Sequence, residues 1–164
     1  MNLLNPQTPY DSLVLLLAEQ EGELNQNWQG FQEWAVAALE SGMDTPSLRI
    51  LAGINPAKDW EVRDYLECAT RELGWNLPGR EELLYIFARK IAALMVARKK
   101  PLAKGCRELY RIFNKLRDRY ANLNVWLHYD DEFDLMEAGI LNYPMATLEQ
   151  DVLQAAAELA NDCA

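Results

Sequence analysis

The chain of 164 residues predicts an all-α protein, because three features recur along its sequence. Proline stands near the start of several segments and glycine near their ends, which is the asymmetry typical of helices. Between these points, apolar residues recur at the spacing of one helical face. No stretch alternates apolar and polar residues for long enough to require a sheet. We therefore expect one all-α domain over residues 1–164, with about six to eight helices.

The first half of the chain predicts four helices. In the second of them, Phe31, Trp34 and Ala38 lie three or four residues apart and form an apolar face. The third begins at Thr45, whose hydroxyl is a good cap for the free N–H groups of a helix start. The four predicted segments run from residues 8–9 to Gly22, from residues 25–27 to Gly42, from residues 44–46 to Gly53, and from residues 55–56 to Gly74.

The second half predicts a long central helix and at least two more. A wide apolar stripe, which includes Phe87, Ile91 and Met95, indicates that the central helix is covered on several sides. The segment 120–141 gives the weakest pattern. We expect a helix near 80–99, a helix from Pro101 to about residue 118, a very short extended segment or a buried turn at 124–128, a helix over 130–138 closed by Gly139, and a last helix opened by Asn142 and Pro144.

Charge divides the sequence into three parts. Residues 79–119 hold 12 of the 16 Lys and Arg residues and only 4 Asp or Glu, whereas residues 120–164 hold 9 Asp or Glu and no Lys or Arg. Residues 1–78 are also acidic, and the whole chain has a formal net charge of −9. One interpretation is that the basic segment lies between its acidic flanks and is neutralised by them, each exposed pair contributing only about 0–1 kcal/mol. The other is a pair of separated surfaces of opposite charge.

The basic segment predicts one charged helix face, which we call the basic stripe. Its residues fall within about a quarter turn of each other, opposite an apolar face that contains Leu109 and Phe113. An exposed stripe of this kind is suited to phosphates or to an acidic partner. An acidic chain is nevertheless unusual for a nucleic-acid-binding protein. The stripe consists of Lys104, Arg107, Arg111 and Lys115.

The acidic C-terminal part predicts a surface for a basic partner. Complementary charge speeds the encounter of two proteins, and aromatic anchors supply most of the binding free energy. The alternative interpretation is a solvated acidic helix whose aromatic residues belong to the core. We call this set the acidic cluster; its residues are Trp126, Tyr129, Asp130, Asp131, Glu132, Asp134 and Glu137. Trp60 is a second candidate anchor, or it packs under the loop before its helix.

Catalytic and metal motifs are weak in this sequence. His128 is the only histidine, so a metal site there would use Asp130 and Asp134 as further ligands. No zinc, EF-hand, nucleophile-elbow or phosphate-loop spacing is present. We expect His128 to be a half-buried or capping residue near Trp126, and we expect neither a cofactor nor an enzyme. The three cysteines form no CxxC pair, which predicts free thiols rather than a disulfide framework.

The segment 42–53 reads Gly-Met-Asp-Thr-Pro-Ser-Leu-Arg-Ile-Leu-Ala-Gly. It resembles a Gly-x-Asp-(Ser/Thr)-Pro-x-Leu-Arg-x-Leu-Ala-Gly stretch in small bacterial proteins of unassigned function. Proteins of this kind look like bacterial accessory or immunity proteins, which implies a binding role and no particular activity.

Together these observations predict a non-enzymatic bacterial protein that binds another protein. The specific hypothesis is an immunity protein or inhibitor that occludes a basic toxin or nuclease through the acidic cluster. The alternatives are a nucleic-acid-associated regulatory protein that uses the basic stripe, and a metal-dependent enzyme around His128. The mean hydropathy of −0.24 and the absence of a long apolar run predict no membrane span. The first residues lack the basic region of a secretory signal, so we expect a cytoplasmic protein.

Overall fold

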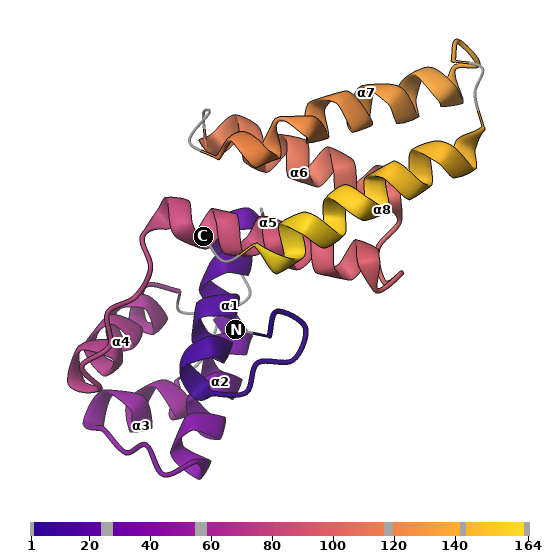
Figure 1. The fold of residues 1–164 in the computed structure, drawn as a ribbon. Helices are drawn as coiled ribbons and strands as arrows, with labels where there is room; N and C mark the ends of the chain where they lie inside the picture. Colours follow the sequence, from indigo (N-terminus) through magenta and orange to yellow (C-terminus); the bar gives the residue numbers. More distant parts are fainter. Residues whose placement is uncertain (1, 24–27, 55–58, 117–119, 142–143, 163–164) are drawn as a thin grey trace. The chain divides into compact units, whose positions relative to one another are not determined.

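The computed structural model describes residues 2–23, 28–54, 59–116, 120–141 and 144–162. Those residues form eight α-helices and one 3₁₀ turn, with no strand among them, so the predicted all-α class is confirmed (Figure 1). They group into two compact units, Met1–Leu83 and Leu84–Ala164. One domain over residues 1–164 stays a prediction.

The first unit contains the four helices predicted for the first half of the chain. They are α1 (Pro9–Gly22), α2 (Trp28–Glu40), α3 (Pro46–Gly53) and α4 (Asp59–Glu72). Helix α2 packs against each of the other three. The core of this unit surrounds α2, where Phe31, Trp34 and Ala38 are buried as their spacing predicts.

Side-chain caps explain where two of these helices begin. The Thr8 hydroxyl accepts a hydrogen bond from the backbone N–H of Asp11 at 3.0 Å, and the Thr45 hydroxyl accepts one from Leu48 at 3.3 Å. Each threonine precedes a proline in the first helical turn, where the missing proline N–H costs nothing. The residues predicted to open α2 and α4, at 25–27 and 55–56, lie outside the described residues, as does Asn142.

The second unit contains α5 (Arg80–Val96), α6 (Leu102–Leu116), the turn η1 (Ala121–Leu123), α7 (Val125–Glu137) and α8 (Met145–Asn161). The boundary between the units falls in the first turn of α5. Helices α6, α7 and α8 pack against one another, and α6 turns an apolar face with Cys106, Leu109 and Ile112 into this unit.

Two predicted boundaries are wrong. The segment 124–128 is neither extended nor a buried turn, because α7 already begins at Val125 and only the exposed Asn124 before it lies in a turn. Leu123 and Trp126 are both fully buried, three residues apart, which is the spacing of one helical face. Helix α5 ends at Val96 rather than near residue 99, since Arg98 adopts a left-handed conformation with φ of 55°. By contrast, Gly139 ends α7 as predicted, with φ of 71°.

Candidate functional site

The acidic cluster lies on α7, and the structure separates its members into buried and exposed residues. Trp126 is 0% exposed and Asp130 is 8% exposed. Trp126 therefore belongs to the core, as the alternative interpretation held for the aromatic residues, and is not a surface anchor. Tyr129 is half-buried and touches Trp126 edge-on, with ring centroids 5.7 Å apart. Asp131, Asp134 and Glu137 are exposed, and Glu132 is half-buried.

Arg107 joins the basic stripe to the acidic cluster. Its Nε lies 3.3 Å from Asp130 Oδ1, and its Nη2 lies 2.5 Å from Asp134 Oδ1. The charges of Asp134 and Asp130 raise the pKa of Arg107. Part of the predicted neutralisation between the basic segment and its acidic flank is therefore present at this point. It removes one cation from the stripe as a free charge, while the two carboxylates together keep one net negative charge.

The other residues of the basic stripe are exposed on α6. Lys104, Arg111 and Lys115 all face solvent. Among the described residues, Lys104 and Arg111 form no ion pair with a carboxylate. The stripe is thus exposed on the surface, although its second residue, Arg107, forms ion pairs with α7.

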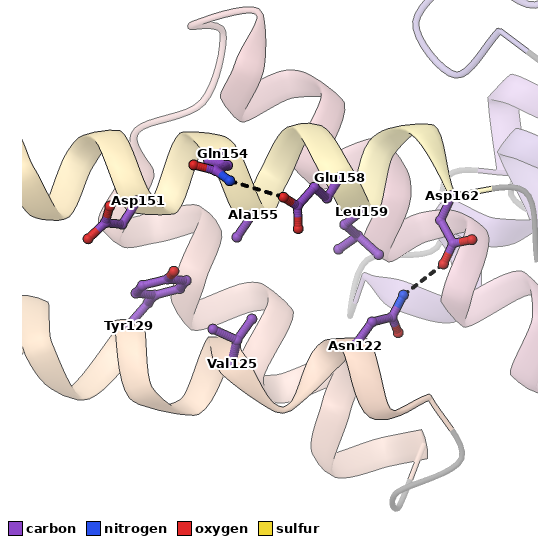
Figure 2. A pocket seen from close by; sticks show the side chains of 9 residues that line it. All are labelled: Asn122, Val125, Tyr129, Asp151, Gln154, Ala155, Glu158, Leu159 and Asp162. Atoms are coloured by element: carbon purple, nitrogen blue, oxygen red, sulfur yellow. Dashed lines mark hydrogen bonds between the residues drawn. The ribbon is translucent and has the colours of Figure 1, made fainter.

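A groove lies between α8 and the α7 side of the unit, with a cavity volume of about 550 Å³. Figure 2 shows Val125 and Tyr129 projecting from α7 toward α8. Three carboxylates line the groove, and all of them come from the α8 side. The complete lining is Asn122, Val125, Tyr129, Asp151, Gln154, Ala155, Glu158, Leu159 and Asp162.

No Lys or Arg of the described residues lines this groove. Glu158 accepts a hydrogen bond from the Gln154 amide at 3.2 Å. Asp162 accepts one from the Asn122 amide at 2.8 Å, drawn as a dashed line in Figure 2, and another from the Tyr85 hydroxyl at 2.5 Å. These donors are neutral, so none of these hydrogen bonds brings a positive charge to the carboxylates of the groove.

The position of Tyr129 in this groove raises the pKa of its phenol. Its pKa is raised first by burial and then by the charges of Asp151 and Glu132, with a smaller contribution from Glu158. An ionised phenol would add a further negative charge beside these carboxylates, which is the physical reason for the direction. The half-buried Tyr129 is the one predicted aromatic of the cluster that lines the groove.

The sequence prediction missed the α8 contribution to this site. Asp151, Ala155 and Glu158 follow one another at i, i+4 and i+7 on a single face of α8, and Asp162, the C-cap of the helix, follows at i+11. The core face of the same helix, which holds Leu148, Val152 and Ala156, lies next to it. This spacing of acidic residues, together with the complete absence of Lys and Arg after residue 119, is the sequence signal that could have predicted the acidic face of α8.

The structure does not assemble the predicted metal ligands around His128. Its side chain is 68% exposed, and its Nε2 lies 3.2 Å from Glu132 Oε1. Asp130 and Asp134 contact Arg107 instead. The expectation of a half-buried His128 is thus wrong, because the residue lies on the solvent-exposed side of α7. Within the described ranges, no group of three His, Cys, Asp or Glu side chains is arranged to hold a metal ion.

Trp60, Cys68 and Cys106 are not among the residues that line the groove. Trp60 is 63% exposed on α4, beside a hollow of about 400 Å³ lined by its own helix. Cys68 and Cys106 are free thiols, as predicted, and Cys163 lies outside the described residues. Burial raises the pKa of the Cys106 thiol to about 12, and the charge of Asp130 adds to the effect.

The fold and the groove define a small all-α protein with an acidic groove between two helices. In the described part of the chain, no helix has the length and apolar character needed to cross a membrane. Comparison of the whole chain with protein-family models, with curated proteins and with solved structures gives no match.

Proposed function

We propose that this chain is a protein-binding module whose groove between α7 and α8 takes a basic segment of a partner protein. The observation that carries the proposal is the set of three carboxylates, Asp151, Glu158 and Asp162, on a groove without any described cation. Their charge attracts a basic surface and speeds its encounter. Tyr129 and the apolar side chains between the carboxylates offer contact area to the same partner.

The more specific form of the proposal is an immunity protein or inhibitor that blocks a basic toxin or nuclease. Such a protein acts by occlusion and needs no catalytic group of its own. Compared with the sequence-based hypothesis, the contact surface moves from Trp126 and Asp130 toward α8. Asp131 and Glu137 remain exposed on α7 and extend the negative surface beyond the groove.

A matched pair of variants tests the proposal by capture from a native cell lysate treated with nuclease. The groove variant carries Asp151→Asn and Glu158→Gln, and the control variant carries Glu33→Gln and Glu40→Gln on the exposed side of α2. Each removes two negative charges. We expect one basic protein, in stoichiometric amount, on the wild type and the control, and its loss from the groove variant.

Equal capture by the groove variant would contradict the assignment of the groove. The captured protein is then assayed for toxin or nuclease activity in the presence of the wild-type chain and of the groove variant. Inhibition by the wild type alone supports the immunity or inhibitor form. A captured partner whose activity is the same with and without the wild-type chain would support the protein-binding module but contradict its inhibitor form.

A second candidate function uses the basic stripe to bind nucleic acid, and it is favoured by the exposure of Lys104 and Arg111. Released counterions give such binding a steep salt dependence. We expect, for this function, that duplex DNA or RNA binds at low salt and that Lys104→Ala with Arg111→Ala weakens it. Lack of retention on DNA at low salt would rule the stripe out as a nucleic-acid surface.

A further inference from the structure

The second unit carries two exposed surfaces of opposite charge. One is the groove, with Asp151 and Glu158 on α8, and neither carboxylate has a cationic partner among the described residues. The other is the basic stripe, in which Lys104 and Arg111 are exposed and have no carboxylate partner within the same described ranges. The chain therefore presents a charged surface and its complement at the same time.

The two surfaces share one spacing. Asp151, Glu158 and Asp162 stand at i, i+7 and i+11, and so do Lys104, Arg111 and Lys115. At a rise of 1.5 Å per residue, both rows place their charges at about 10.5 Å and then about 6 Å along the helix axis. Two helices with this spacing match charge for charge when they run parallel. In the antiparallel direction the longer interval of one row faces the shorter interval of the other.

The lining of the groove also fits the stems of the basic side chains. Val125, Ala155 and Leu159 lie among the carboxylates, with the ring of Tyr129 beside them (Figure 2). Lysine and arginine bury their methylene stems on apolar surface while their charged ends reach polar groups. Arg107 takes no part, because Asp130 and Asp134 already hold its guanidinium.

From this match we infer that the groove of one copy receives the α6 helix of a second copy, with Lys104 beside Asp151 and Arg111 beside Glu158. The contact is head-to-tail, since the two surfaces that meet are different. This inference goes beyond the proposed function: a second copy covers the same groove that a basic partner would use. Self-association and partner capture then compete, and the protein is free to bind its partner when dilute.

Sedimentation equilibrium over a concentration series tests the inference on the full chain. At about 0.01 M ionic strength the screening length is roughly 30 Å, and near 1 M it is roughly 3 Å. We expect an average mass that rises above 18.8 kDa with concentration at low salt and returns to 18.8 kDa at high salt. A mass of 18.8 kDa throughout the low-salt series overturns the inference, while leaving the proposed function to its own test.

A charge-swap experiment identifies the surfaces. The stripe variant (Lys104→Glu, Arg111→Glu) and the groove variant (Asp151→Lys, Glu158→Lys) each place like charges together, which should weaken self-association at least about 100-fold. Mixed in equal amounts, the two variants regain association, because the reversed stripe of one meets the reversed groove of the other. Failure of the mixture to associate overturns the inference.

Two controls separate this contact from general electrostatics. A variant with Glu33→Lys and Glu40→Lys alters charge on α2 by the same amount as the groove variant and should associate like the wild type. Carbodiimide coupling of a mixture of ¹⁴N- and ¹⁵N-labelled chains should give a Lys104–Asp151 amide between chains of different label. A loss of association in the α2 variant equal to that in the groove variant would show that the groove has no special role.

Discussion

The hydroxyl of Tyr85 joins three segments of the second unit. It donates a hydrogen bond to Asp162 Oδ2 at 2.5 Å and accepts one from Asn122 Nδ2 at 2.5 Å. The ring is only 3% exposed and stacks on Tyr120, with centroids 4.0 Å apart. Replacing Tyr85 by Phe keeps the ring and removes the hydroxyl. Because hydrogen bonds to charged groups contribute about 1.5–3 kcal/mol, we expect a loss of that size at neutral pH.

The same hydroxyl gives the protein a defined response to alkali. Burial, reinforced by the bond to Asp162, raises the pKa of Tyr85 from 10.0 to about 12. The folded state therefore holds this proton more tightly than the unfolded state. The stabilisation is complete below pH 10 and declines as the pH rises from about 10 to about 12. At about 1.4 kcal/mol for each pH unit, the total decline is roughly 2–3 kcal/mol.

Urea unfolding at several pH values between 8 and 12, followed by circular dichroism, measures both effects. The informative quantity is the difference between the wild type and Tyr85→Phe, because other groups titrate in both proteins. We expect this difference to shrink by roughly 2–3 kcal/mol as the pH rises through the alkaline range. A constant difference from pH 8 to pH 12, or a Tyr85 that ionises near pH 10 in an ultraviolet titration, would refute the reasoning.

Three further predictions concern packing, thiol reactivity and a helix cap. A Cβ at Gly105 would lie within 3 Å of the buried Met95 side chain. In urea unfolding, the clash in Gly105→Ala should cost about 1–3 kcal/mol of stability, partly offset by about 1 kcal/mol of gained helix propensity. Met95→Ala should remove the clash. With the other two cysteines changed to serine, Cys106 should react with iodoacetamide at pH 8 only as fast as the chain unfolds, because it is fully buried and its pKa is about 12; rapid labelling of the folded chain would contradict this. Hydrogen bonds from the Ser47 side chain and backbone lower the pKa of Glu72, so the stability they supply is present above pH 4.5 and declines as the pH falls through the lowered value; Ser47→Ala should lower Tm at pH 7 and have a smaller effect at pH 2.

Local sequence signals predicted most of the helices and several of their ends. Thr8 and Thr45 cap their helices as expected, and Gly139 ends α7. These signals act within four or five residues, so they are visible without knowledge of the fold. The start of α7 was missed because Val125 and Trp126 favour an extended segment locally, whereas burial of Trp126 in the unit stabilises the helix.

The site was only partly predictable for a different reason. The residue pattern predicts Asp130 and Asp134 as surface carboxylates, but their contact with Arg107 spans 23 and 27 residues and depends on how α6 packs on α7. Tyr129 was identified as a binding residue, and it does line a groove. The opposite wall comes from α8, which sequence analysis treated only as an apolar helix.

The double contact of Arg107 has a consequence for how a partner would approach. Two of the carboxylates on α7 share the charge of one guanidinium, so the electric field near that helix is weaker than its composition implies. On α8, no described Lys or Arg lines the groove beside its carboxylates. A positively charged molecule diffusing toward this unit is therefore attracted to both helices, because the five carboxylates of α7 still exceed the single charge of Arg107 by four. Replacing Arg107 by a neutral residue would add one unit of net negative charge at α7 and leave α8 unchanged, so more encounters would begin at α7 and a smaller share of them at the groove.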